Sequence, residues 1–352
     1  PPPPPPPHHS SPTPDETEDG GKGRMFQYVT RRVMWSIVML VLVIASVFVI
    51  FFVMPGGAGG RTKDGQSLLA IKFAGKNPRA ELVDQVEKRL GLDQPVVVQF
   101  GRYVGNAFTG DLGYSYQTQE DVLDALLGRF PATASLALGA SVLWLTLGVS
   151  IGVISALKRR SLLDRGSMLF ALVGVSMPTF WLGLIAVFTF DAGPIQALQV
   201  YDTGSYVGIT EDPVQWFKVM WLPWFVLAFT SAAIYARMVR GNLLEVQGED
   251  YIRTARAKGL REKSVTRHAL RSALTPIVTM YGLDLGILLG GAVITEQIFN
   301  IPGIGSYAVG AIRSQNFPII LGTTVFAAGF VIIANLIVDI LYAALDPRVR
   351  YS

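Results

Sequence analysis

Long apolar runs recur along this chain, with few charged positions inside them. Six such runs cover residues 33–53, 132–156, 167–190, 216–236, 277–298 and 319–345. A transmembrane helix needs about 20 predominantly apolar residues to cross the hydrocarbon core of a bilayer. The pattern therefore predicts an all-α integral membrane protein with about six transmembrane helices, embedded in a lipid bilayer.

The composition agrees with this prediction. Of the 352 residues, 50% are hydrophobic and only 16% are charged, which is too apolar for an ordinary soluble domain. The sequence has no cysteine, which excludes disulfides, Cys-ligated metals and a thiol nucleophile within it. The net charge of +4 is explained by loops rich in Lys and Arg rather than by a nucleic-acid partner, and we expect none.

The distribution of basic residues predicts the orientation in the membrane. Basic residues precede the first run, fill the loop 158–165 and occur nine times in the stretch 237–271, whereas the loop 191–215 has four acids and no Lys or Arg. Cytoplasmic loops of membrane proteins carry an excess of Lys and Arg. We therefore expect both termini and the two basic loops to be cytoplasmic and the acidic loop to be external.

The chain divides into five predicted parts. Residues 1–24 contain nine prolines and are expected to form a disordered cytoplasmic tail. Residues 25–54 form the first transmembrane helix, and residues 55–130 form an external subdomain with helical patterns at 80–90 and 96–108. Residues 131–345 hold the remaining five spans, including a cytoplasmic loop at 237–276, and residues 346–352 form a cytoplasmic C-terminus.

The sequence shows no pattern of catalytic residues. It has no glycine-rich loop ending in Gly-Lys-Ser or Gly-Lys-Thr, no His-Glu-x-x-His pair and no Gly-x-Ser-x-Gly elbow. The pair His8 and His9 is too isolated to predict a metal site. We therefore expect no catalytic, cofactor-binding or metal-binding residue, and a transport function rather than an enzymatic one.

The loop 249–276 carries the most informative pattern. Its apolar positions recur at helical spacing, with Tyr251, Ile252 and Ala255 on one face of a first helix and Val265, Ala269 and Ala273 on a second. Gly259 lies between the two helices and is expected to end the first in a left-handed conformation. A basic helix lying on anionic lipid headgroups is an alternative interpretation of the same stretch.

The same loop resembles the EAA loop of permease subunits of binding-protein-dependent ABC importers. Glu-Asp-Tyr at 249–251 stands where the family has Glu-Ala-Ala, a variant similar to the dipeptide and oligopeptide branch, and a glycine follows ten positions after the glutamate. The residues of the loop that carry the resemblance are Glu249, Asp250, Tyr251, Ala255, Gly259, Leu274 and Pro276.

Further segments are similar to recurring segments of that branch. They lie at 89–95, 110–113, 131–136, 177–183, 298–305 and 335–348, so the resemblance runs from about residue 25 to the C-terminus. Two features depart from the family pattern: the external loop around 191–212, and Asp284, which stands where an uncharged polar residue is expected.

The resemblance implies a function and a set of partners. In this family the loop forms a coupling helix that docks on a separate ATPase, so the chain would form half of a translocation pore that works by alternating access. The expected partners are a related second permease, two cytoplasmic ATPase subunits that hold ATP and Mg, and an extracytoplasmic solute-binding protein. The expected substrate is a di- or oligopeptide, and the expected location is the cytoplasmic (inner) membrane of a prokaryote.

Polar residues inside the predicted spans suggest a second possibility. An intramembrane carboxylate is expensive to desolvate, so Asp284, Glu296 and Asp339 are functional candidates, and a proton-coupled secondary transporter or channel would use them as a relay. The alternative role is an interhelical hydrogen bond, which we favour for Asp339 beside Asn335 and leave open for Asp284. Glu296 lies at the end of its span and is expected to reach the external interface.

Three glycines mark a close helix contact in the fifth span. Gly282, Gly286 and Gly290 recur every four residues, which lets another helix approach closely along one face. We therefore predict that this face packs against a partner span, and such a face would suit the interface between two permease subunits.

Overall fold

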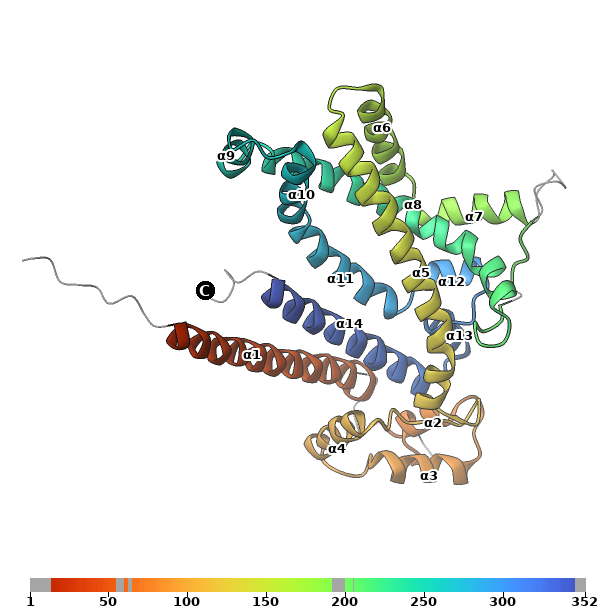
Figure 1. The fold of residues 1–352 in the computed structure, drawn as a ribbon. Helices are drawn as coiled ribbons and strands as arrows, with labels where there is room; N and C mark the ends of the chain where they lie inside the picture. Colours follow the sequence, from red (N-terminus) through yellow and green to blue (C-terminus); the bar gives the residue numbers. More distant parts are fainter. Residues whose placement is uncertain (1–13, 55–59, 63–64, 192–199, 205, 346–352) are drawn as a thin grey trace, which may run out of the picture.

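The computed structural model describes residues 14–54, 60–62, 65–191, 200–204 and 206–345. Helices make up most of this part of the chain (Figure 1). The described elements in chain order are α1 (Pro14–Phe48), the π-helix η1 (Val49–Val53), α2 (Leu68–Ala74), α3 (Ala80–Leu90), α4 (Val96–Thr109), β1 (Tyr114–Ser115), β2 (Glu120–Asp121), α5 (Val122–Leu157), α6 (Leu162–Ser176), α7 (Thr179–Phe190), α8 (Pro213–Val246), α9 (Asp250–Ala257), α10 (Glu262–Ala273), α11 (Thr275–Leu289), α12 (Val293–Ile298), α13 (Ile304–Ser314) and α14 (Phe317–Leu345).

The long helices confirm an all-α membrane protein. Four helical stretches within the described residues are long and apolar enough to cross a bilayer, namely Gln27–Val53, Val122–Leu157, Pro213–Val246 and Phe317–Ile340. Two bent pairs, α6 with α7 and α10 with α11, pass the same test together, so the number of spans lies between 4 and 6. The sequence prediction of about six spans falls within this range.

The third predicted span is broken in the middle. The run 167–190 was expected to be continuous, but α6 and α7 meet at an angle of 97°. Pro178 lies at the break; it lacks an N–H group and disfavours helical geometry in the residue before it. Met177 accordingly adopts an extended conformation with φ −90° and ψ 118°.

The fifth predicted span is shorter than expected. The run 277–298 divides into α11, which ends at Leu289, and the separate short helix α12. Gly291 lies between them with φ +125°, a conformation that L-residues with a side chain rarely adopt. The paired glycines at 290 and 291 therefore end the span before residue 298.

Three predicted boundaries also differ from the structure. α1 begins at Pro14, within the tail expected to be disordered, where proline at a helix start and the acidic residues 15–19 favour a helix N-terminus. α5 begins at Val122 rather than 131, because the Asp121 side chain caps it by accepting the Leu123 N–H at 3.0 Å. α8 continues to Val246, past the predicted loop start at 237. Residues 1–13 and 346–352 lie outside the described part.

The segment between the first two spans is helical, as predicted. The patterns at 80–90 and 96–108 correspond to α3 and α4, while α2 and the short antiparallel pair β1–β2 were not predicted. Apolar side chains from this segment, from the end of α1 with η1 and from α14 form one buried cluster, which includes Phe48, Phe52, Phe73, Val86 and Leu321. The segment is therefore packed onto α1 and α14 rather than standing free.

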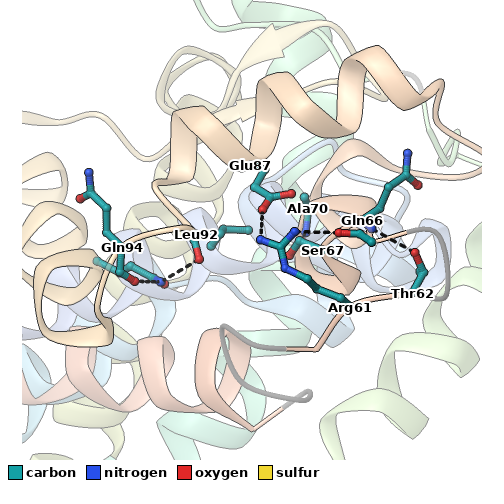
Figure 2. A network of polar contacts seen from close by, with 10 residues as sticks. Arg61, Thr62, Gln66, Ser67, Ala70, Glu87, Leu92 and Gln94 are labelled. Atoms are coloured by element: carbon teal, nitrogen blue, oxygen red, sulfur yellow. Dashed lines mark hydrogen bonds and ion pairs between the residues drawn. The ribbon is translucent and has the colours of Figure 1, made fainter.

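Polar contacts hold the turns of this segment together (Figure 2). Arg61 donates to Glu87 Oε1 at 2.7 Å, which ties the stretch before α2 to α3. Gln99 Nε2 donates to the carbonyl oxygens of Gln94 at 2.8 Å and Leu92 at 3.5 Å, which fixes the turn between α3 and α4. The predicted family segment 89–95 thus forms an ordered helix connection.

The spans pack as two groups, one formed by α5, α6 and α8 and the other by α1, α11 and α14 (Figure 1). α5 packs along α8, and α6 packs against both; α14 packs between α1 and α11, and α11 also contacts α5. Figure 1 shows α9 and α10 at the opposite end of the molecule from α2–α4. This separation places the loop 249–276 and the helices α2–α4 at different ends of the spans.

Candidate coupling loop and intramembrane polar residues

The loop between α8 and α11 folds as the pattern predicted, with α9 and α10 separated by a glycine break. Gly259 has φ +76°, and the N–H of Gly259 donates to Arg256 O at 2.9 Å while that of Leu260 donates to Ala255 O at 3.3 Å. These two bonds form a Schellman motif, which ends a helix with a left-handed residue. The predicted role of Gly259 at the helix end is confirmed.

One face of the loop is anchored to the spans. Ile252 is fully buried, and it belongs to a cluster formed by five further residues of α5, α8 and α10: Ala156, Leu243, Val265, Ala269 and Ala273. Ala255 packs partly buried against this cluster. The apolar face predicted for the second helix is therefore confirmed, and it lies on the ends of α5 and α8.

Tyr251 does not share that buried face. Its residue is 48% exposed, and its hydroxyl lies 3.1 Å from Ser272 Oγ on α10. Neighbouring residues of a helix point about 100° apart, so Ile252 takes the buried position and Tyr251 turns outward. The prediction that grouped these two with Ala255 was wrong in this detail.

The other face of the loop is charged and exposed. Glu249 is exposed and makes no side-chain cap bond at the start of α9, and the Asp250 side chain is 97% exposed. Arg256 Nε lies 3.0 Å from Glu262 Oε1, which links α9 to α10 across the glycine break. Exposed ion pairs of this kind add little stability. This charged face is free for contact with another molecule.

Leu274 and Pro276 form the junction between the loop and the span. Leu274 is both the C-cap of α10 and the N-cap of α11, and it packs against the buried cluster around Trp144. Pro276 lies in the first turn of α11, where a missing N–H costs no hydrogen bond. α10 and α11 meet here at 45°, so the loop passes into the span through a short, packed corner.

Asp164 organises the end of the spans next to this loop, although it is not among the candidate residues predicted from the sequence. It is 5% exposed, and Arg240 of α8 donates to both of its oxygens, at 2.7 and 3.1 Å. Ser155 Oγ of α5 donates to Oδ1 at 2.6 Å, and the Arg160 N–H donates to Oδ2 at 2.8 Å. One carboxylate thus joins α5, α6 and α8.

A sequence signal for Asp164 did exist. It is the only acidic residue in the basic loop 158–165, and it lies three positions after Ser161, whose Oγ accepts the Asp164 N–H at 3.3 Å. A Ser followed three residues later by an acid is a pattern typical of a helix N-terminus. The sequence pattern does not single out its partner Arg240, which is one of nine basic residues in the stretch 237–271.

Asp284 makes an interhelical hydrogen bond. Tyr235 of α8 donates to Asp284 Oδ2 at 2.7 Å, and Asp284 itself is half-buried on α11. Next to it on α11, the Tyr281 hydroxyl lies 3.1 Å from Ser141 Oγ of α5. Both polar contacts therefore hold α11 against the group formed by α5 and α8.

Glu296 is a structural carboxylate at a helix corner. It is fully buried within the protein, and its expected position at the external interface stays a prediction. Thr133 Oγ1 donates to Oε1 at 2.8 Å and the Ser306 N–H donates to Oε2 at 2.7 Å, while the Ile304 N–H donates to Thr133 Oγ1 at 2.9 Å. The carboxylate binds the first turn of α13, where the helix dipole favours negative charge.

Asp339 forms an interhelical contact, but its partner is a charge on α1. Arg32 Nη1 lies 3.0 Å from Asp339 Oδ2, and the two side chains are 45% and 31% exposed. Asn335 Oδ1 is buried and has no hydrogen-bond partner among the described residues. Asp284, Glu296 and Asp339 thus bond to partners on different elements.

The glycine face of α11 is occupied within this chain. A Cβ added at Gly282 would collide with the Val338 side chain, and one at Gly286 would lie 2.7 Å from Ala334 Cβ, both on α14. A Cβ at Gly290 would meet Ala327 Cβ at an ordinary 3.6 Å, so Gly290 belongs to the helix end instead. The predicted close packing of another span is therefore confirmed at Gly282 and Gly286, and the span is α14 of this chain, so at these two positions the face is not left open to a second subunit.

We expect Gly282→Val to destabilise the fold by about 1–3 kcal/mol, because overpacking forces α11 and α14 apart. Gly166→Val is the matched control, since Gly166 is also helical and a Cβ there meets nothing within 4 Å. The measurement is the thermal unfolding midpoint of the purified protein in one detergent. Equal midpoints for the two variants would contradict the close contact of α11 with α14.

No group of three or more His, Asp or Glu residues that could hold a metal ion occurs within the described ranges. The charged loop face, its apolar anchor and the Asp164 junction therefore remain the features that suggest a site. They suggest contact with another macromolecule.

Comparison with known families gives two matches in consecutive parts of the chain. Residues 148–351 match the family described as "Binding-protein-dependent transport system inner membrane component", and residues 25–137 match its N-terminal component. Together they cover both the segment between the first two spans and the loop 249–276.

Several curated relatives are similar over most of their length. A di/tripeptide transport system permease protein of Pseudomonas aeruginosa is 42% identical over 75% of this chain and 84% of its own. A dipeptide transport system permease protein of Alkalihalophilus pseudofirmus and a glutathione transport system permease protein of Escherichia coli are each 36% identical, over 93% of this chain and all of their own.

Proposed function

Because the chain belongs to the family of inner membrane components of binding-protein-dependent transport systems, we propose that it forms half of the translocation pore of an ATP-driven importer of di- or oligopeptides. Within that family the chain is a permease subunit. The observation that carries the mechanistic part of the proposal is the pair α9–α10: its inner face is anchored on α5 and α8, and its outer face is charged and exposed. This is the arrangement that a docking element needs.

In the proposed mechanism, ATP is bound and hydrolysed on two separate cytoplasmic ATPase subunits, which also hold the Mg²⁺. Their closure moves α9 and α10, which dock on them as coupling helices. The movement passes to α5 and α8 through the cluster around Ile252 and Leu243, and to α6 through Asp164 and Arg240. The group formed by α5, α6 and α8 then rocks relative to α11 and α14 and opens the path outward.

The other partners follow from the same proposal. A related second permease supplies the other half of the pore, and an extracytoplasmic solute-binding protein delivers the substrate to the segment 55–130 and the loop after α7. Both termini and the loop 249–276 are cytoplasmic, as the distribution of Lys and Arg favours. Figure 1 shows α9 and α10 at the opposite end of the molecule from α2–α4, which supports placing the loop and these helices on opposite sides of the membrane.

The names of the relatives support a peptide substrate. Two of them are named for dipeptides or tripeptides, and the third for glutathione, which is itself a small peptide. These relatives favour the ATP-driven importer over a proton-coupled transporter or channel. The structure agrees in one respect, since Glu296 and Asp339 are engaged in hydrogen bonds or ion pairs with other elements.

Reconstitution tests the proposal directly. The chain is incorporated into proteoliposomes with its second permease, the ATPases and the binding protein, and uptake of radiolabelled dialanine is measured. We expect uptake that requires ATP on the ATPase side and is unaffected by a protonophore. Uptake that survives an ATPase unable to hydrolyse ATP, and that a protonophore abolishes, would instead establish the proton-coupled alternative.

A further inference from the structure

A groove runs between the two groups of spans. It has a volume of about 350 Å³, lies between α5 and the start of α11, and is lined by aliphatic side chains together with Thr146, Ser150 and Tyr281. Figure 1 shows α11 between α5 and α14, so this groove follows the seam where the two groups meet. If the pore opens by movement of one group of spans against the other, the contacts across this seam are the ones that change.

Polar groups continue along the seam beyond the groove. Tyr281 contacts Ser141 across it, and Asp284 lies three residues further on, on the same side of α11. Tyr235 fixes one Asp284 oxygen, whereas Oδ1 has no hydrogen bond or ion pair within the part of the chain that the structure describes. The half-buried Asp284 therefore has one carboxylate oxygen without a partner among the described residues, one helical turn beyond the groove residue Tyr281.

This arrangement differs from those of the other intramembrane carboxylates. Asp339 is paired with a cation, and both oxygens of Glu296 accept hydrogen bonds. A single bond from a neutral hydroxyl leaves most of the charge of Asp284 uncompensated, which is costly in an apolar span unless water or a cation completes it. A transient cation in the seam would supply this compensation.

We propose that Asp284 binds the amino-terminal ammonium group of the peptide as it passes through the seam, with Tyr235 holding the carboxylate in place. The inference rests on the proposed function, because the ammonium group is the cation that all unmodified peptides share. A hydrogen bond between two charged groups contributes about tenfold or more in affinity. Asp284 therefore has two roles: it recognises the substrate, and its hydrogen bond to Tyr235 joins α11 to α8.

Equilibrium binding separates this inference from the proposed function. The purified assembly, without the solute-binding protein and without ATP, is titrated with radiolabelled dialanine and with N-acetyl-dialanine, which lacks the ammonium group. We expect wild-type protein to bind dialanine about tenfold or more tightly than its acetylated form. Asp284→Asn, which keeps a hydrogen-bond acceptor for Tyr235, should bind both peptides equally weakly.

Two variants control for a merely structural effect. Asp339→Asn removes another intramembrane charge and should keep the preference for dialanine, while Tyr235→Phe keeps the charge and should weaken dialanine binding less than Asp284→Asn does. Elution of each variant as intact assembly is checked first. Wild-type protein that binds neither peptide, or an Asp284→Asn variant that discriminates as well as wild type, would overturn the inference even if ATP-driven uptake is observed.

Discussion

Replacing Gly259 by Val is expected to abolish ATP-driven uptake while leaving the chain inserted in the membrane and bound to its second permease. Gly259 has φ +76°, so any side chain there costs about 1 kcal/mol in backbone strain and distorts the end of α9. A Cβ at this position meets nothing within 4 Å, so the chain itself leaves the space open. A docked ATPase would occupy that space, and the valine would interfere with it.

The measurement compares co-purification of the ATPases and uptake of dialanine in the variant and in a control. Gly65→Val is a matched control, because Gly65 also has positive φ (+82°) and open space but lies in the segment before α2. The Gly65→Val variant carries similar backbone strain, but the substitution lies outside the loop 249–276. Normal ATPase binding and uptake in Gly259→Val would remove the basis for assigning the loop as a coupling element.

The second large effect is expected at Asp164. Asp164→Asn removes the charge that Arg240 pairs with and leaves a largely buried guanidinium without its counter-ion, which is strongly unfavourable. We expect less assembled complex in the membrane and uptake reduced to a small fraction of wild type. Ser155→Ala, which removes one hydrogen bond of the same carboxylate but no charge, should retain most of the uptake.

A double-mutant cycle distinguishes the ion pair from independent effects. Arg240→Gln alone should cost about as much as Asp164→Asn, and the double variant should be no worse than either single one, because the same contact is lost only once. The measurement is complex stability in a thermal shift assay, followed by uptake. Strictly additive losses in the double variant would show that the two residues act separately.

Local patterns predicted local structure well. The helices at α3, α4, α9 and α10 appear close to where the apolar periodicity indicated, and Gly259 ends α9 as expected. These elements depend on residues near one another in sequence: an amphipathic face and a residue that allows positive φ. Short residue motifs in the loop 249–276 and in six further segments carried the resemblance that the family comparison confirmed.

Long-range partners could not be predicted from the sequence. Asp164 and Arg240 are 76 positions apart, and nothing in a single sequence pairs them. The glycine face of α11 was correctly expected to allow close packing, but hydropathy does not say which helix approaches it. Span interruptions were missed for a related reason, since the apolar runs continue through Pro178 and Gly291 while the backbone does not.

The most direct test of the central claim is site-specific crosslinking of the loop. The sequence has no cysteine, so Asp250→Cys on the exposed face of α9 and Val97→Cys on α4, which is 80% exposed, each introduce a unique thiol. A short thiol-to-amine crosslinker is applied to the transport-competent assembly, and the products are identified by mass spectrometry. We predict that the thiol at position 250 crosslinks to an ATPase subunit and the thiol at position 97 does not. An active assembly in which position 250 never crosslinks to an ATPase would contradict the assignment of this loop as the coupling element.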